Sequence, residues 1–225
     1  MNQKIDRRIS YKIMLDTETC GTLECPFVYD FGFAVVDKRG NVYEKFSFVI
    51  NEVFFGMADL MRTAYYANKI PRYLKDIYEG KRQVVSIWQA RAKMIEMMKK
   101  YETNVVVAHN AHFDYNSLNN TLRYLTKSKY RYFFPYGTII WDTLKMARQV
   151  VAKTPTYIAY CKRNGYIGKN HQVRLTAEIL YRFISHDSNF IESHTGLEDV
   201  LIEAQILAFC FRKKKKMIKE LWAKG

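Results

Sequence analysis

The sequence predicts an α/β domain in which helices pack on a mixed β-sheet. Residues 28–36 and 42–50 form a hairpin of two strands, and after residue 80 the apolar pattern alternates between helical and strand spacing. A length of 225 residues with 48% apolar content suits one domain with a full core. We therefore expect one folded unit without internal repeats.

The first half of the chain supplies three of the strands. Residues 11–15 (YKIML) begin a strand that runs into acidic residues, and 28–36 (VYDFGFAVV) is typical of a mostly buried strand. A turn at 37–41 precedes 42–50 (VYEKFSFVI), where apolar and polar residues alternate and predict one solvated face. Residues 51–80 have a weaker pattern, which favours one or two short helices in a mobile, substrate-facing segment.

The second half alternates helices with two short strands, which makes five strands in all. Residues 83–101 have the spacing of an amphipathic helix with a basic outer end. The later elements are expected as a strand at 105–108, a helix at 114–125, a strand at 138–141, and helices at 143–151, 155–163, 172–184 and 197–221. The folded unit would span 11–211, between a basic arm at 1–10 and the basic end of the last helix at 212–225.

The charge and composition of the chain limit its partners and its compartment. Lysine and arginine number 36 against 22 acids, and a net charge of +14 favours a polyanionic partner. Aromatic residues make up 15% of the chain and suit stacking on nucleic-acid bases. The four cysteines form no CxxC pair, which argues against a disulfide framework or zinc ribbon, and no apolar run resembles a signal peptide or membrane span. We expect a cytoplasmic protein.

Two acids close the first strand. Asp16 and Glu18 form a DxE pattern, and because side chains alternate across a strand, both carboxylates would point the same way and could share a divalent cation. They follow a buried apolar run, so they would emerge at the carboxyl end of a core strand, where α/β sheets place their sites. The alternative is a solvated strand end.

Two further elements carry candidate site residues. In 105–118 (VVVAHNAHFDYNSL) a buried strand breaks before a helix, and Asp114 falls in the first turn of that helix. It would be a third carboxylate at the same sheet end, or only a helix-capping acid. In 194–199 (HTGLED) His194 precedes Asp199 by five residues at the start of a long apolar helix. The alternative for His194 alone is a surface histidine.

These motifs together resemble the DEDDh exonucleases, the group that includes the epsilon proofreading subunit of bacterial DNA polymerase III, ribonuclease T and oligoribonuclease. The matching segments, in order, are LDTETCG at 15–21, AHNAHFD at 108–114, WDTLKMAR at 141–148 and the spaced histidine and aspartate of 194–199. The resemblance covers about residues 11–210. The related subgroup with a tyrosine four residues before the last acid does not fit, because Thr195 stands there.

The resemblance implies a fold, a metal centre and a set of residue roles. The fold would be ribonuclease H-like, with a mixed five-stranded sheet flanked by helices. His194 would be the general base. Two magnesium or manganese ions would be held by Asp16, Glu18, Asp114 and Asp199. The terminal nucleotide would contact Thr17, Leu23, Asn110 and Phe113.

Some of these positions keep an alternative. Leu23 would take the place of an apolar wedge in the family, because Thr22 stands at the usual position of that wedge, and Phe113 could instead be ordinary helix packing. Asp142 is expected to cap the following helix rather than bind metal. His112 is expected on the helix exterior. His171 and His186 are expected to be structural or surface residues.

The implied activity is hydrolysis of phosphodiester bonds from the 3′ end of single-stranded nucleic acid, releasing nucleoside 5′-monophosphates. DNA is favoured over RNA because the first two motifs are closer to the proofreading and repair members. The alternatives are a 3′–5′ exoribonuclease and a nucleic-acid-binding module without catalysis. The chain would act alone or together with a separate polymerase or replication protein. The basic run at 212–216 (RKKKK) would be a solvated helix end or a tail that grips phosphates.

Overall fold

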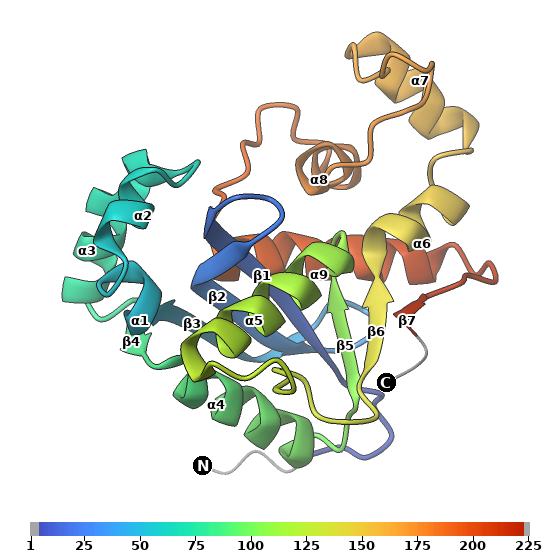
Figure 1. Cartoon of the computed structure of the whole chain (residues 1–225). Helices are drawn as coiled ribbons and strands as arrows, with labels where there is room; N and C mark the ends of the chain where they lie inside the picture. Colours follow the sequence, from blue (N-terminus) through green and yellow to red (C-terminus); the bar gives the residue numbers. More distant parts are fainter. Residues whose placement is uncertain (1–4, 223–225) are drawn as a thin grey trace.

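The computed structural model describes residues 5–222, and its centre is a seven-stranded mixed sheet (Figure 1). The order of strands across the sheet is β4-β3-β2-β1-β5-β6-β7. The strands are β1 (Lys12–Gly21), β2 (Pro26–Val36), β3 (Val42–Ile50), β4 (Gln83–Val85), β5 (Val105–Ala108), β6 (Ile139–Asp142) and β7 (Glu220–Trp222). Residues 1–4 of the expected arm and 223–225 of the expected C-terminal end lie outside the described residues.

All five predicted strands are present, but the expected count of five is wrong. The two additional strands, β4 and β7, are three residues long and lie at the two edges of the sheet. β4 falls within the segment predicted as the start of a helix, and the helix itself begins only after Ser86, whose hydroxyl accepts a hydrogen bond from the Gln89 N–H. A three-residue edge strand is too short to show a strand period in the sequence.

The direction of the strands places the carboxyl ends of three of them at the same end of the sheet. β1 pairs in parallel with β5, and β5 pairs in parallel with β6, whereas β1 and β2 are antiparallel. The carboxyl ends of β1, β5 and β6 therefore lie at the same end of the sheet. Asp16 and Glu18 of β1, the turn after β5, and Asp142 of β6 share that end.

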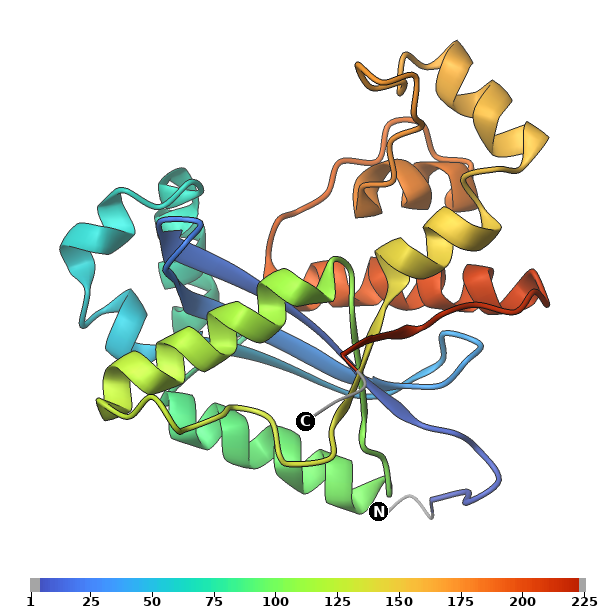
Figure 2. The ribbon, with the colours of Figure 1, turned by 45° about the vertical axis from the view of Figure 1, so that its right-hand side comes forward.

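Helices cover both faces of the sheet (Figures 1 and 2). Ile13 and Leu15 pack in the core that also contains residues of α4 and α5, whereas Met14 packs in the core beneath α6 and α9. This alternation follows from the two-residue period of a strand that is buried on both faces. The helices are α1 (Asn51–Phe54), α2 (Ala58–Arg62), the 3-10 turn η1 (Ala67–Lys69), α3 (Ile70–Tyr78), α4 (Ile87–Lys100), α5 (Ala111–Thr126), α6 (Thr143–Val150), α7 (Pro155–Arg163), α8 (Ala177–Ser185) and α9 (Gly196–Arg212).

Two further predicted helices have a boundary that is wrong by five residues or more. α8 begins five residues later than expected, after Thr176 caps it, and the preceding loop forms a small bridge between Ile167 and Val173. The helix expected to reach residue 221 ends at Arg212, and Lys214 has a left-handed backbone with φ of 51°. Continuing the helix would stack like charges from the lysine run on successive turns, which is unfavourable. The chain instead continues to β7, which pairs with β6.

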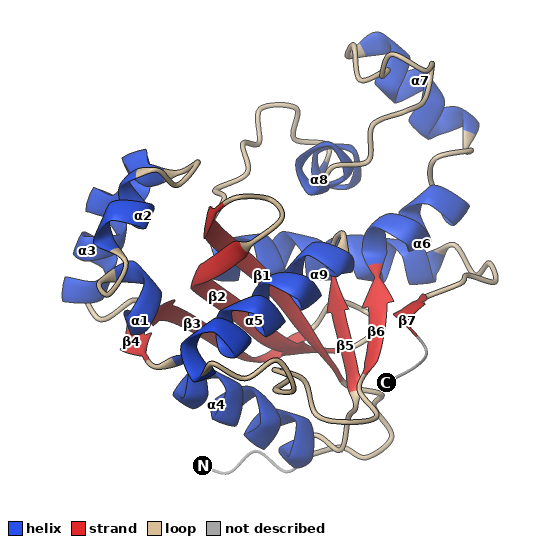
Figure 3. Ribbon diagram, in the orientation of Figure 1, coloured by secondary structure: helices blue, strands red, loops and turns tan. Residues whose placement is uncertain are grey.

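Two groups of helices stand at the sheet end where β1, β5 and β6 finish. Figure 3 shows α1–α3 on one side of this end and α7 with α8 on the other. The N-terminus of α5 lies between them. The basic run at 212–216 is at the far end of α9, roughly 20 Å from Asp199 at the helical rise of about 1.5 Å per residue. This distance favours the solvated-end alternative for that run.

Candidate functional site

Four acids predicted from the sequence approach one another at this end of the sheet. Asp16 and Glu18 lie on β1, Asp114 is in the first turn of α5, and Asp199 is in the first turn of α9. Burial raises the pKa of Asp16 well above its ordinary value, and the charges of Glu203, Asp114, Glu18 and Asp199 raise it further. Residues far apart in the sequence thus form a single electrostatic cluster.

The cluster includes the predicted histidine. Glu18, His194 and Asp199 can each place one ligand atom within 4.8 Å of the others. Burial raises the pKa of Glu18 to about 9, with the charges of Asp30 and Asp199 adding to the effect. Burial also raises the pKa of Asp199 to about 8, followed by repulsion from Glu192. Too little positive charge therefore lies beside these carboxylates to offset their burial and mutual repulsion.

Asp114 is joined to the cluster from the other face of the sheet. Its buried carboxylate accepts a 2.8 Å hydrogen bond from the Thr17 hydroxyl. Because Thr17 lies between Asp16 and Glu18 on β1, its side chain points to the α5 face, as those of Ile13 and Leu15 do. Burial raises the pKa of Asp114 to about 7, although the Thr17 bond lowers it. The Thr17 side chain thus orients Asp114.

The start of α9 is fixed against β2 by a very close backbone approach. A Cβ atom added to Gly32 would lie 2.2 Å from the Gly196 carbonyl carbon, so no larger residue fits there without displacing the helix. The Gly196 N–H donates a 2.9 Å hydrogen bond to Asp30, a buried carboxylate of β2. Asp199 accepts from the Thr195 N–H at 3.0 Å and from the Ser193 hydroxyl at 3.3 Å. These bonds set the position of the Asp199 carboxylate.

Asp30 is a buried carboxylate with several hydrogen-bond partners, and the sequence analysis did not identify it. It accepts hydrogen bonds from the Tyr73 hydroxyl at 2.6 Å and from the Arg82 guanidinium at 3.2 Å, in addition to the bond from Gly196. Arg82 also binds Glu198 of α9 at 2.9 Å. Its position in the otherwise apolar run VYDFGF could have identified it, because a charged group in a buried strand needs a partner.

His194 is held by residues of the 51–80 segment. Its ring stacks on Tyr66 with 4.7 Å between ring centroids and 16° between ring planes. The Lys69 ammonium donates to the carbonyl oxygens of Ser193 and His194 at 2.7 and 3.2 Å. Burial and the nearby Lys69 charge lower the pKa of His194, which keeps the imidazole neutral near neutral pH. A neutral imidazole beside carboxylates can accept a proton.

Sequence reasoning also missed Tyr66, Lys69 and Glu203. Glu203 lies one helical turn after Asp199 and is only 3% exposed. Burial and the charge of Asp114 raise its pKa well above the ordinary range, and its Oε2 atom has no hydrogen-bond partner among the described residues. Its i, i+4 spacing from Asp199 on an apolar helix could have revealed it. Tyr66 and Lys69 had no comparable signal, because residues 51–80 lack a clear period.

The remaining predicted residues, Leu23, Asn110 and Phe113, border a separate hollow. Leu23, on the loop between β1 and β2, is 84% exposed, and it lines this hollow together with Asn110 and Phe113 of the second motif. We call this depression the Leu23 hollow; its other lining residues are Glu24, Pro26, His112, Asn116 and Asn120.

Three minor expectations about polar residues are confirmed. Asp142 caps α6 by accepting hydrogen bonds from the Leu144 and Lys145 N–H groups, and it also accepts one from the Asn110 N–H. His112 is exposed on α5, and His186 is exposed at the end of α8. Asn110 has a left-handed backbone with φ of 66°, which turns the chain from β5 into α5.

The donor set of the cluster fits divalent cations. Its ligand atoms are carboxylate oxygens, which magnesium and manganese prefer, together with one imidazole. The cluster holds more buried carboxylates than the single ammonium of Lys69 can neutralise. The orphaned Oε2 of Glu203 is a further buried acceptor at the inner side. Bound cations would remove this imbalance of charge.

Comparisons with known proteins find structural similarity. E. coli Exonuclease I, in complex with a dA16 oligonucleotide, matches with a TM-score of 0.50 and 17% identity over 92% of this chain and 41% of its own. Exonuclease X, in complex with 5′ overhanging duplex DNA, matches with a TM-score of 0.43 and 17% identity over 89% of this chain and 91% of its own. No protein-family model and no curated protein sequence matches the chain.

The likeness to Exonuclease I confirms the predicted fold class. The chain has the ribonuclease H-like α/β fold, with a mixed sheet between two layers of helices. It spans less than half the length of Exonuclease I. Among the described residues, none of the helices is both long enough and apolar enough to cross a membrane.

Proposed function

We propose that the chain is a metal-dependent 3′–5′ exonuclease that removes nucleoside 5′-monophosphates from single-stranded nucleic acid, with DNA favoured over RNA. The observation that carries this proposal is the convergence of Glu18, His194 and Asp199 within 4.8 Å, beside Asp16 and Asp114. These are the residues that the DEDDh resemblance assigns to catalysis. The catalytic unit would be residues 11–211.

The carboxylates would hold two magnesium or manganese ions. Asp16, Glu18 and Asp199 would bind one ion, and Asp16 together with Asp114 would bind the other. When bound, such a pair stabilises the charge on the attacking and the leaving oxygen of a phosphodiester. Thr17 supports this arrangement by fixing the Asp114 carboxylate through its buried hydroxyl.

His194 would accept the proton of the attacking water. Its lowered pKa supports this role, because a base must be unprotonated at the working pH. Stacking on Tyr66 restricts the ring, and Lys69 holds the backbone of the His194 loop. These contacts keep the imidazole beside Glu18 and Asp199 while leaving the His194 side chain partly accessible.

The terminal nucleotide would sit in the Leu23 hollow. The exposed Leu23 side chain and the Phe113 ring offer apolar contacts to a base and sugar, and Asn110 offers an amide. Asn110 is at the same sheet end as the acids, because its N–H is bonded to Asp142 there, and it lines a second depression together with Asp16. A nucleotide in this hollow would have its phosphate at the carboxylate cluster.

An assay with end-labelled single-stranded DNA and RNA tests this function. With manganese or magnesium, the wild type should release 5′-monophosphates from the 3′ end, and chelator should abolish release. Asp16→Ala and His194→Ala should lose most of the activity, whereas Glu96→Ala, on the exposed surface of α4, is the control expected to retain it. Equal release by wild type and both site variants would refute the mechanism. The ratio of DNA to RNA rates decides between the deoxyribonuclease and exoribonuclease alternatives, and nucleic-acid binding without release would support the non-catalytic module.

A further inference from the structure

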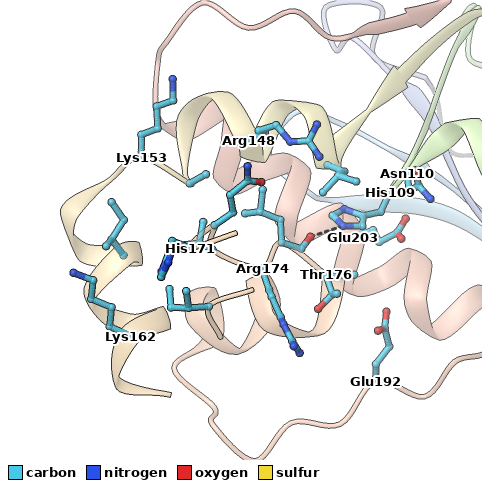
Figure 4. Close-up of a pocket in the computed structure, with 18 of the residues that line it drawn as sticks. His109, Asn110, Arg148, Lys153, Lys162, His171, Arg174, Thr176, Glu192 and Glu203 are labelled. Atoms are coloured by element: carbon cyan, nitrogen blue, oxygen red, sulfur yellow. Dashed lines mark hydrogen bonds between the residues drawn. The ribbon is translucent and has the colours of Figure 1, made fainter. Parts of the chain in front are cut away.

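A groove of about 1170 Å³ begins at Asp16 of the acidic cluster and shares Asn110 with the Leu23 hollow. We call it the basic groove. Its inner end is bordered by Asp16, Glu203 and Glu192, and it then runs between α6, α7 and the loop before α8. Figure 4 shows Asn110 and Glu203 at one end of this groove, and Lys153 and Lys162 toward the other.

The outer part of the groove carries only positive charge. Arg148, Lys153, Lys162 and Arg174 line it, and the three acids among the lining residues are all at the inner end. Within residues 5–222, none of these four cations is paired with a carboxylate, in contrast to the neighbouring Arg182, which binds Glu178 at 2.5 Å. Unpaired cations along a groove attract an extended polyanion.

The wall that presents these cations is tied to the sheet. The His109 ring, at the end of β5, donates from Nε2 to the Leu175 carbonyl at 2.8 Å and accepts at Nδ1 from the Thr143 hydroxyl at 2.9 Å. The Tyr157 hydroxyl donates to the Arg174 carbonyl at 2.6 Å. The loop that carries Arg174 is therefore anchored at both α7 and the sheet, so the groove has a defined shape.

The two depressions differ in charge, as expected if a single strand passes from one to the other. The Leu23 hollow has no lysine or arginine among its described lining residues, whereas the basic groove has four. Asn110 lines both, so the two depressions meet at Asn110, and the basic groove also reaches Asp16 of the acidic cluster. Apolar side chains of the groove, such as Leu144 and Ile158, can contact sugars and bases between the phosphates.

From this arrangement we infer that the basic groove binds the phosphodiester backbone of the single strand on the 5′ side of the bond to be cut. The inference rests on the proposed function for the direction of the strand, with the terminal nucleotide in the Leu23 hollow. It adds a second binding region that no motif of the sequence indicates. His171, expected to be a structural or surface residue, is exposed and lines this groove.

A binding measurement in chelator tests the groove independently of catalysis. The variant Arg148→Gln/Lys153→Gln/Lys162→Gln/Arg174→Gln removes the four cations, all of which are exposed, so its fold should be kept. The matched control removes four exposed cations at the opposite end of the sheet: Lys38→Gln/Arg39→Gln/Lys45→Gln/Lys99→Gln. Fluorescence anisotropy with labelled single-stranded DNA and RNA gives Kd over a series of salt concentrations.

The groove variant should bind either oligonucleotide at least roughly tenfold more weakly than the control. Its log Kd should also depend less on log salt, by roughly 0.7 for each phosphate that the variant no longer neutralises. An oligonucleotide whose upstream linkages are uncharged methylphosphonates should bind wild type and groove variant alike. Equal Kd values and salt slopes for groove variant and control on the charged strand would overturn the inference. The groove variant should lose affinity for DNA and for RNA to the same degree, because the groove contacts the backbone that both strands share.

A second substrate separates the two proposals. The p-nitrophenyl ester of thymidine 5′-monophosphate has no upstream strand, so the groove variant should hydrolyse it at the wild-type rate while its KM for an oligonucleotide rises. An unchanged oligonucleotide KM with normal ester hydrolysis contradicts the groove and leaves the exonuclease intact. Failure of the wild type to hydrolyse either substrate contradicts the proposed function, and the anisotropy result still decides the groove.

Discussion

The Thr17 hydroxyl donates a buried 2.8 Å hydrogen bond to the Asp114 carboxylate, joining β1 to α5 across 97 residues of sequence. Thr17 stands between the two acids of β1, so one strand presents Asp16 and Glu18 on one face and supports Asp114 from the other. The hydrogen bond is what connects the second motif to the first.

Removal of this hydrogen bond should impair catalysis. We expect Thr17→Val to lower kcat by roughly 10–100-fold, because the loss of a residue that orients a metal ligand typically costs this much. Thr17→Ser keeps the hydroxyl and should retain most of the activity. The check is steady-state kinetics across a manganese titration, and a Val variant as active as the Ser variant would show that the bond has no role in positioning Asp114.

Stability without metal should fall as pH rises. The folded state raises the pKa of Glu18 to about 9, of Asp199 to about 8 and of Asp114 to about 7, from ordinary values of 3.8 for Asp and 4.5 for Glu. Between the ordinary and the raised values the folded state binds more protons than the unfolded state, so the free energy of unfolding decreases with pH.

Thermal unfolding in chelator, from about pH 5 to about pH 9, measures this dependence. Tm should fall more steeply for wild type than for Glu18→Gln, which cannot ionise at that position. Manganese should raise Tm more at the alkaline end, where the carboxylates are ionised. A wild-type Tm in chelator that changes with pH no more than that of Glu18→Gln would count against the cluster.

The contact between Gly32 and Gly196 should tolerate no side chain. Gly32→Ala places a Cβ atom 2.2 Å from backbone of α9, so either the helix shifts or the strand bends. We expect a loss of about 1–3 kcal/mol or more in the free energy of unfolding, together with weaker activity, because Asp199 moves with α9. Gly168→Ala is the control, since its Cβ would meet only one atom, at 3.5 Å. Equal denaturant midpoints for the two variants would contradict the close approach.

The pH dependence of activity should respond to Lys69. The charge of Lys69 lowers the pKa of both His194 and Glu18. Lys69→Gln should therefore raise both pKa values and move the acid limb of the kcat/KM profile to higher pH. Lys69→Arg keeps the charge and should leave that limb near its wild-type position. An acid limb displaced to lower pH in the Gln variant would refute the proposed effect of Lys69.

The stacking of Tyr66 on His194 should position the proposed base through the tyrosine ring alone. The Tyr66→Phe variant keeps the ring face and should preserve kcat, whereas Tyr66→Leu should lower it roughly tenfold by releasing the imidazole, which corresponds to about 1.4 kcal/mol of transition-state stabilisation. Single-turnover rates with saturating enzyme measure this step apart from substrate binding. Identical rates for the Phe and Leu variants would show that the stack does not position His194.

The elements that sequence predicted best are those with a strong local period. β5 at 105–108 and α7 at 155–163 match their predicted bounds, because a buried valine run and a Thr-Pro helix start are unambiguous. The edge strands β4 and β7 were missed because three residues show no period and their pairing depends on distant neighbours. The last helix was predicted to be too long, because the apolar pattern does not include the repulsion between charges in the lysine run.

For the site, the motif residues could be predicted from the sequence, but the residues that hold them in position could not. Glu18, His194 and Asp199 do meet, whereas Tyr66 and Lys69 come from a segment with no period, so only the folded chain shows them beside His194. Glu203 could have been found from its spacing to Asp199 on an apolar helix. The four cations of the basic groove are spread over α6, the turn after it, α7 and the loop before α8, so no compact motif could indicate it.

The most direct test of the central claim is anomalous diffraction from crystals of the wild type grown with manganese. We expect two anomalous peaks within coordination distance of the Asp16, Glu18, Asp114 and Asp199 carboxylates, and the loss of at least one peak in Asp16→Asn. Crystals that contain manganese in solution but show no peak at these carboxylates would contradict this claim.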